Sequence, residues 1–184
     1  MTVLVTGAAG FIGYHVSEAL LARGERVIGV DVLNDYYDVN LKKNRRDRLL
    51  AHSDFEFVQE DIGNRDAMFA LANANTDITT IIHLAAQAGV RYSLENPFAY
   101  IESNVIGHLV MLEVCRHMEG LEHFVYASSS SVYGGNTKLP FSVDDPTDTP
   151  VSIYAATKKA DELMSHSYSH LFGIPATGLR FFTV

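Results

Sequence analysis

Three glycines at positions 7, 10 and 13 constrain the fold of this chain more than any other feature. They follow the apolar run Val3-Leu4-Val5 and precede an amphipathic stretch that reaches Arg23, which is the pattern of a strand turning into a helix. At such a turn, unpaired backbone N–H groups and the positive helix end point at one place, where a pyrophosphate is held. Gly7 would allow the sharp turn, Gly10 a close approach of the diphosphate, and Gly13 close packing of helix on strand. The alternative interpretation is a turn that merely needs a positive φ.

A second predicted strand, residues 26–31, ends in an acidic side chain. Asp31 lies eighteen residues after Gly13, where an acid meets the adenosine ribose hydroxyls in dinucleotide-binding folds. The same carboxylate repels a 2′-phosphate. The order of strand, glycine turn, helix, strand and acid therefore predicts a dinucleotide site that favours NAD over NADP.

Apolar runs of strand length alternate with amphipathic stretches of helix length along the chain. Strands are predicted near residues 3–6, 26–31, 55–59, 80–84, 123–128 and 176–180, and helices near 11–23, 40–51, 64–74, 97–118 and 153–171. This alternation is typical of an α/β fold, a doubly wound parallel sheet or Rossmann fold. We expect one NAD-binding domain over residues 1–184. Because the chain stops in an apolar run, we expect it to be the N-terminal part of a longer protein.

The charge balance argues against two classes of partner. Lys and Arg number 14 against 22 Asp and Glu, a net charge of −8, which disfavours nucleic acid or an anionic membrane as partner.

The N-terminus enters the first strand without a leader, and no apolar run is expected to span a bilayer. The single cysteine, Cys115, lies in an apolar helical pattern and is expected to be buried. These features predict a cytoplasmic protein. The eight histidines show no metal-ligand spacing, so no metal is expected.

Further candidate residues follow the predicted strands, at the edge that holds ligands in such sheets. Asp61 either accepts a hydrogen bond from the adenine amino group or caps the helix 64–74. The small residues of Leu84-Ala85-Ala86-Gln87 suit a backbone lying flat against a dinucleotide, and the preceding His83 is interpreted as a buried, hydrogen-bonded side chain. Segment 32–40 either covers the adenosine or is a solvated loop. The basic cluster 42–48 is interpreted as a solvated helix face.

Hydroxyl groups and a Tyr–Lys pair carry the expected chemistry. Ser128-Ser129-Ser130-Ser131 end the fifth strand, and Tyr154 and Lys158 share one face of the next helix. A phenol with an ordinary pKa of about 10 is a poor base at neutral pH, but a neighbouring ammonium favours the phenolate. Tyr154 is therefore the candidate base that takes the proton of a secondary alcohol as nicotinamide takes the hydride. Ser129 would hydrogen-bond the substrate oxygen, with Ser128 or Ser130 as alternatives, and Lys158 would also hold the nicotinamide ribose.

The glycine turn together with Tyr154 and Lys158 resembles the extended short-chain dehydrogenase/reductases, in particular the NAD-dependent nucleotide-sugar epimerases and dehydratases. The resemblance covers essentially the whole chain, and it implies a smaller substrate domain beyond residue 184. It implies cofactor contacts by Gly7, Gly10, Phe11, Ile12, Gly13, Asp31, Asn34, Asp61, Ile62, Leu84, Ala85, Ala86, Gln87, Asn104, Tyr154 and Lys158.

Two segments narrow the resemblance to the UDP-glucuronate 4-epimerase branch. They are Leu33-Asn34-Asp35-Tyr36-Tyr37-Asp38-Val39 and Ala86-Gln87-Ala88-Gly89-Val90-Arg91-Tyr92-Ser93. Members of this branch oxidise C4 of the bound sugar with tightly held NAD, turn the 4-keto intermediate over and return the hydride to its other face. The resemblance implies a UDP-sugar substrate contacted by Arg91, Ser129 and Ser130. Arg91 either forms a bidentate contact with the sugar carboxylate or is a surface or cofactor contact.

Alternative functions use the same residues differently. A UDP-glucose/UDP-galactose 4-epimerase would act on a neutral sugar, and a non-catalytic NAD-binding module would not need a Tyr–Lys pair. A sugar 4,6-dehydratase is disfavoured, because Ser129-Ser130-Ser131 stands where it needs an acid pair. The resemblance also implies a homodimer through helices 97–118 and 153–171, in which Val105, Leu109 and Leu112 fit either dimer contact or burial against the sheet.

Overall fold

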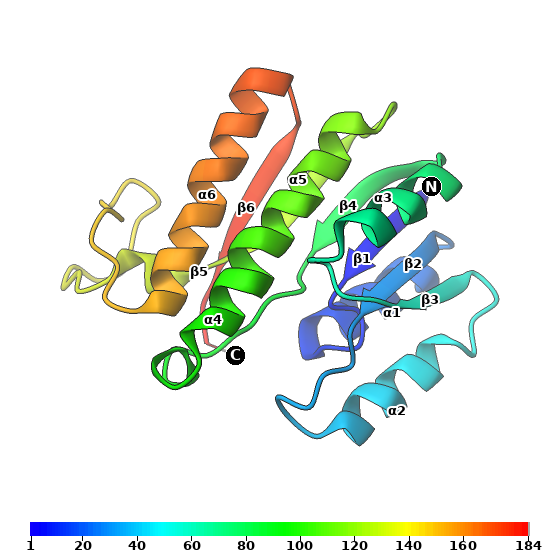
Figure 1. Cartoon of the computed structure of the whole chain (residues 1–184), viewed down its shortest axis with the longest axis horizontal. Helices are drawn as coiled ribbons and strands as arrows, with labels where there is room; N and C mark the ends of the chain where they lie inside the picture. The colour runs from blue at the N-terminus through cyan, green and yellow to red at the C-terminus, as the bar shows by residue number, and fades with distance from the viewer. Residues whose placement is uncertain (184) are drawn as a thin grey trace.

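One parallel sheet organises the protein, whose computed structural model describes residues 1–183. Its order is β3-β2-β1-β4-β5-β6, and every neighbouring pair is parallel. The order reverses between β1 and β4, which is the topological switch point of a doubly wound fold. The predicted Rossmann architecture is confirmed (Figure 1). The strands are β1 (Thr2–Thr6), β2 (Arg26–Asp31), β3 (Phe55–Gln59), β4 (Ile78–His83), β5 (His123–Ser129) and β6 (Ala176–Phe181).

Helices cover both faces of this sheet. Figure 1 shows α5 and α6 side by side over the half of the sheet that holds β5 and β6. The helices are α1 (Phe11–Ala22), α2 (Val39–Leu49), α3 (Arg65–Ala74), α4 (Pro97–Tyr100), α5 (Gly107–His117) and α6 (Ile153–Phe172), with short turns η1 (Tyr92–Leu94), η2 (Ile101–Ile106) and η3 (Ser130–Tyr133). These bounds lie close to the predicted ones. Strands buried on both faces are continuous apolar runs in the sequence, whereas amphipathic helices show apolar residues every three or four positions.

The core is divided by the sheet into two apolar clusters. Leu4 points to the face where Met68 of α3 and Met111 of α5 pack. Its neighbours Val3 and Val5 point to the opposite face, toward α1 and α2. Successive side chains of a strand alternate between faces, so β1 supplies both clusters. The central strand is therefore fixed from both sides, and the turn that follows it is held rigidly.

The predicted helix 97–118 is interrupted in the structure. It consists of α4, one π-helical segment η2 and α5. π-Turns often accompany functional sites, because they redirect a side chain from the helical spacing. Asn104 lies in η2, and its buried amide bonds the backbone N–H and C=O of Gln87 and the hydroxyl of Thr157. These bonds hold η2 against the segment that follows β4.

The stretch Pro97–His117 is also long and apolar enough to cross a membrane by length and composition, with a mean hydropathy of 1.2 over 18 residues. The sequence-based expectation missed this run by length and composition, although a core helix of a folded domain can have the same length and composition. Half of that window is buried in the domain. Leu112 is fully buried in the core, whereas Leu109 is 39% exposed, which separates two positions that the sequence left equivalent. Covering a sheet requires an apolar helix face, and this requirement accounts for the hydropathy.

Two buried histidines lie behind the end of β4. His83 Nδ1 is 2.7 Å from Thr6 Oγ1, which also accepts hydrogen bonds from the N–H groups of Leu84 and Ala85. The Thr6 hydroxyl therefore donates to His83, whose imidazole is neutral. His108 Nε2 is 2.8 Å from Ser165 Oγ. Burial lowers the pKa of His83 to about 3 and lowers that of His108 well below its ordinary value. The sequence interpretation of His83 as a buried, hydrogen-bonded side chain is confirmed.

We expect these histidines to make the fold sensitive to acid. The unfolded chain binds protons at both imidazoles near pH 6.5 while the folded state does not, so the free energy of unfolding falls as pH drops below 6.5 toward 3. His108→Gln cannot charge, and between pH 7 and pH 5 it should lose about 2 kcal/mol less stability than the wild type. Urea unfolding at several pH values measures this. Exposed His52→Gln is the control and should follow the wild type, and equal losses in all three proteins would contradict the assignment.

Candidate active site

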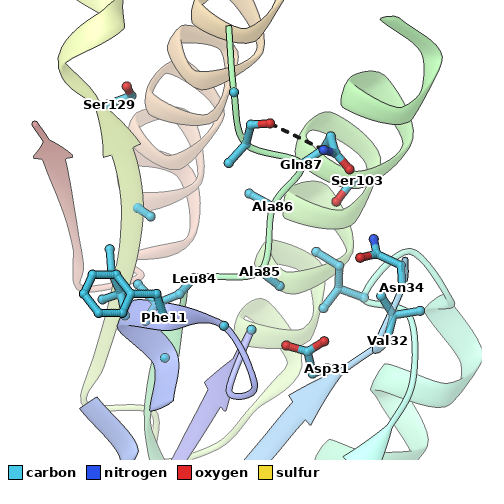
Figure 2. A pocket seen from close by; sticks show the side chains of 18 of the residues that line it. Phe11, Asp31, Val32, Asn34, Leu84, Ala85, Ala86, Gln87, Ser103 and Ser129 are labelled. Atoms are coloured by element: carbon cyan, nitrogen blue, oxygen red, sulfur yellow. Dashed lines mark hydrogen bonds between the residues drawn. The ribbon is translucent and has the colours of Figure 1, made fainter. Parts of the chain in front are cut away.

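A cavity of about 1200 Å³ runs along the carboxyl ends of the strands. Residues after all six strands line it, including Gly7 after β1, Asp31 at the end of β2 and Leu84 after β4. Figure 2 shows Asp31 and Ser129 toward opposite ends of this pocket, with Leu84, Ala85 and Ala86 along the wall between them. The sheet therefore brings together residues that are far apart in sequence, at the edge where doubly wound folds bind ligands.

The glycine turn is shaped by close backbone contacts. Gly7 has a φ of +72°, and a Cβ there would lie 2.8 Å from the backbone nitrogen of Ala85. Gly13 has no positive φ, but its Cβ would lie 2.0 Å from the carbonyl oxygen of Gly7. The alternative of a turn that merely needs a positive φ thus explains Gly7 and fails for Gly13. The start of α1 is pressed against the glycine turn, and the turn is pressed against the segment that follows β4. The turn also lines the cavity.

Asp31 is held by two backbone groups. Its Oδ2 accepts from Ala9 N–H at 3.1 Å, and its Oδ1 accepts from Leu33 N–H at 2.9 Å. The carboxylate thus links the glycine turn to the segment after β2. Each oxygen keeps a lone pair toward the cavity that can accept from a ribose hydroxyl.

The sequence reasoning missed two basic residues at this end of the cavity. Lys42 and Arg45 of α2 line it, although their cluster was interpreted as a solvated helix face. Lys42 is only 5% exposed, and its ammonium donates to Asn34 O at 2.8 Å and to Asn34 Oδ1. Asn34 and Tyr37 line the cavity too, so segment 32–40 does cover this end. The three-residue spacing of Lys42 and Arg45 was the available signal, since it places both on one helix face.

Asp61 lines the cavity and does not cap the following helix. Its Oδ1 accepts from Gly63 N–H at 2.8 Å, while the cap of α3 is Asn64, whose side chain accepts from Ala67 N–H. The helix-cap interpretation of Asp61 is therefore wrong. Asn64 begins the helix three residues later because its amide oxygen reaches the first free N–H groups.

The hydroxyl cluster at the end of β5 separates into distinct roles. Ser128 Oγ donates to Glu162 Oε1 at 2.6 Å, and Glu162 is also bound by Arg180. Ser129 Oγ accepts from Ser131 N–H at 3.1 Å, which leaves its own proton free to donate. Ser129 and Ser130 both line the cavity. Ser128 is committed to Glu162, which leaves Ser129 and Ser130 as the candidate donors.

Helix α6 presents Tyr154 and Lys158 to the same cavity. Ser152 caps this helix by accepting from Ala155 N–H at 3.0 Å, which fixes the start of its first turn. Tyr154 packs edge-to-face against Tyr100 at a centroid distance of 6.0 Å. Lys158 is 4% exposed, and its ammonium donates to Ala127 O at 2.9 Å. One face of α6 therefore aims a phenol and an ammonium at the end of β5.

The structure brings together all but two of the predicted site residues. Those that line the cavity are Gly7, Gly10, Phe11, Ile12, Gly13, Asp31, Asn34, Asp61, Ile62, Leu84, Ala85, Ala86, Gln87, Ser129, Ser130, Tyr154 and Lys158. Asn104 lies behind the wall and holds Gln87. Arg91 is exposed beside η1 and is not among the lining residues.

Neither a reactive cysteine nor a metal cluster adds to this site in the part of the chain that the structure describes. Cys115 is buried in the core, and burial raises the pKa of its thiol, as expected for an inert side chain. Over residues 1–183, no group of three or more His, Cys, Asp or Glu side chains is arranged to hold a metal ion.

The chain is similar to known proteins along its whole length. A family model described as GDP-mannose 4,6 dehydratase matches residues 4–184. UDP-glucuronate 4-epimerase 4 of Arabidopsis thaliana is 54% identical over 184 residues, which cover 100% of this chain and 42% of that protein.

Two solved structures extend the comparison. UDP-glucuronic acid 4-epimerase from Bacillus cereus, in complex with UDP-glucuronic acid and NAD, has a TM-score of 0.91 and 38% identity and covers 100% of this chain and 57% of its own. UDP-glucose 4-epimerase from Thermotoga maritima, with UDP-glucose, has a TM-score of 0.85 and 30% identity and covers 98% and 55%. The chain thus spans about half the length of the proteins it matches.

We expect Gly13→Ala to damage the glycine turn. The added methyl group would meet the Gly7 carbonyl at 2.0 Å, and an overpacked contact of this kind costs about 1 to 3 kcal/mol. Binding of the expected dinucleotide, NAD, should weaken by about 10- to 100-fold, because the turn must shift to relieve the contact. Titration calorimetry measures the affinity. The control is Gly135→Ala, where a Cβ meets nothing within 4 Å, and equal affinity in both variants would contradict the role of the turn.

Proposed function

The chain belongs to the GDP-mannose 4,6 dehydratase family, and from this premise we propose that it is the NAD-binding part of a nucleotide-sugar 4-epimerase. The observation that carries the proposal is that Ser129, Tyr154 and Lys158 line the same cavity as the glycine turn and Asp31. A binding module would need the turn and the acid alone. The relatives above, named as UDP-glucuronate and UDP-glucose 4-epimerases, support the same reaction class.

The residues present fit NAD. Gly7 and Gly13 line the cavity, and the backbone contacts at both leave no room for a Cβ, so the backbone of the turn is open to a diphosphate. Asp31 offers two acceptor oxygens and a negative charge that repels a 2′-phosphate. Asp61 lies farther along the cavity and can accept from the adenine amino group. Bound NAD supplies the reversible oxidation of a secondary alcohol.

The protein's own side chains would move the proton. Tyr154, as phenolate, takes the proton of the sugar C4 hydroxyl and later returns it to the same oxygen. Ser129 donates a hydrogen bond to that oxygen and keeps it in line with the phenol. Lys158 supports the phenolate with its positive charge and offers a donor to the nicotinamide ribose. Turning the 4-keto sugar over between the two steps inverts C4, and no net redox change results.

Dehydration fits this cavity poorly, although the family is named after a 4,6 dehydratase. Loss of the C6 hydroxyl requires one group to remove the C5 proton and another to protonate the leaving oxygen. The carboxylates that line the cavity are Asp31, Glu60, Asp61 and Glu102. Asp31 ends β2, and Glu60 and Asp61 follow β3, so all three lie away from β5. The backbone of Glu102 lies beside Gly63. At the end of β5 the lining groups are serines, which are weak acids and weak bases.

For the substrate we propose UDP-glucuronate, converted to UDP-galacturonate. The 54% identity to a plant UDP-glucuronate 4-epimerase supports this sugar over UDP-glucose, whose epimerase from Thermotoga maritima is 30% identical. Arg91 is exposed beside η1, with a guanidinium that can bind a carboxylate through two parallel hydrogen bonds. Its contact with the sugar carboxylate stays a prediction.

Two further expectations stay predictions. The homodimer would use the outer faces of α5 and α6, where Leu109 and Leu163 are exposed. Apolar side chains on an outer helix face are what a dimer contact would cover. The cytoplasmic location stays a prediction as well.

The substrate assignment is tested on the full-length protein. We expect it to interconvert UDP-glucuronate and UDP-galacturonate with no added reductant, because the hydride removed from C4 returns to it. NMR of each UDP-sugar incubated with the protein follows the reaction. Turnover of UDP-glucose and UDP-galactose alone would favour the neutral-sugar epimerase. Binding of NAD with no turnover of any of these sugars would favour a non-catalytic module.

The role of the phenol is tested by Tyr154→Phe. We expect this variant to keep bound NAD, because the glycine turn and Asp31 are untouched, and to lose turnover by about 100-fold or more, as removal of a general base does. Turnover and NAD content are measured on the same sample. Tyr133→Phe, which removes a buried phenol bound to Arg180, is the matched control and should retain turnover. Unchanged turnover in Tyr154→Phe would remove this residue from the mechanism.

A further inference from the structure

Lys158 is held by a buried carboxylate that the proposed mechanism does not use. Its ammonium lies 3.1 Å from Asp161 Oδ2 and 2.9 Å from Ala127 O. Asp161 is 0% exposed, and Lys158 is 4% exposed. The two residues are three positions apart on α6, which places them on one face of the helix. An ion pair therefore stands directly behind the wall of the cavity.

Among residues 1–183, the basic groups that face Asp161, other than Lys158, are neutral or already paired. Burial leaves His83 of β4 and His108 of α5 neutral and raises the pKa of Tyr126 on β5. Arg180 of β6 is occupied by Glu162 and by Tyr133 of η3. Burial also raises the pKa of Tyr100 on α4, to about 12. Lys158 and Asp161 thus form a charge pair among groups that are neutral or already paired, and the charge of nearby Glu162 adds to the rise in the pKa of Asp161.

The pair is poorly arranged for stability alone. Asp161 Oδ1 is buried and has no hydrogen-bond partner among residues 1–183. Burial raises the pKa of Asp161 to about 6, even beside the Lys158 ammonium. A buried ion pair with an unsatisfied oxygen contributes little to folding and often less than apolar residues would. We therefore look for the effect of Asp161 on the position and charge of Lys158 rather than on the stability of the fold.

We propose that Asp161 is a positioning residue for the epimerisation, one that fixes the Lys158 ammonium at the cavity wall and limits its electrostatic effect on Tyr154. An ammonium has three donors, and Ala127 O and Asp161 Oδ2 take two of them. The third is left for the cavity that Lys158 lines. The Asp161 charge opposes the field that the ammonium exerts on the phenol one helical turn away. This inference rests on the proposed function.

Asp161→Asn separates charge from position in the full-length protein with NAD bound. Asparagine keeps an acceptor oxygen for Lys158 but carries no charge, so the ammonium acts on Tyr154 unopposed. The rising limb of the pH profile of turnover should move to lower pH by about one unit. The ultraviolet absorbance of phenolate, with Tyr154→Phe as the blank, should move by the same amount. This absorbance is a readout independent of turnover.

Asp161→Ala removes the charge and the acceptor together. It should show the same shift as Asp161→Asn, together with turnover about tenfold lower at unchanged KM, because one charge-assisted hydrogen bond to the lysine is lost. Since the smaller side chain fits the space, this variant keeps the test open if asparagine prevents folding.

The matched control is Asp145→Asn, which neutralises another Lys–Asp pair, with Lys138 at 2.9 Å, in a loop outside the cavity lining. Its pH profile and phenolate titration should match the wild type. The inference would be overturned if the pH profiles of Asp161→Asn and Asp161→Ala coincided with that of the wild type. It would also be overturned if Asp145→Asn showed an equal shift. If wild-type turnover did not depend on Tyr154, that result would count against the proposed function. The phenolate titration would still decide the role of Asp161.

Discussion

The contact between Gly13 and the carbonyl of Gly7 is the constraint on which the rest of the site depends. With a Cβ at either position, α1 could not press against β1, and the turn could not approach β4. In the proposed function, this contact would fix where a diphosphate lies. Asp31, bound to Ala9, would then set the adenosine end, and the wall of Leu84 to Gln87 would set the direction in which the dinucleotide runs toward β5.

Behind this wall, buried polar groups have few hydrogen-bond partners to choose from. Thr6 connects β1 to His83 and to the backbone of the wall, and Asn104 clamps Gln87 from the π-helical segment. Because buried polar groups must find partners, each of these bonds restricts the backbone that it touches. The Lys158–Asp161 pair belongs to the same layer. The cavity wall is thus kept rigid by hydrogen bonds, although its inner surface is made of small side chains.

Most of the fold and of the site was predictable, because each signal was local. Strand and helix periods, the glycine spacing and the acid at the end of β2 need no knowledge of the third dimension. The failures involved single side chains and one helix irregularity, which leave no period in the sequence. Lys42 reaches Asn34 across a loop, Asp61 bonds Gly63 while Asn64 caps α3, and η2 interrupts a helix whose apolar pattern is continuous. The helix that reads as a membrane span is half buried by the sheet it covers.

The sequence by itself determined the doubly wound sheet, the glycine turn and the pairing of Tyr154 with Lys158, since these depend on residue periods and spacings within single elements. Only the tertiary structure decided that Ser128 is not a free donor, because its hydroxyl is bound to Glu162 from α6. It also decided that the Lys158–Asp161 pair lies among groups of β4, β5, α5 and β6 that are neutral or already paired. Partners of buried polar atoms are chosen by packing, and packing between elements leaves no period in the sequence.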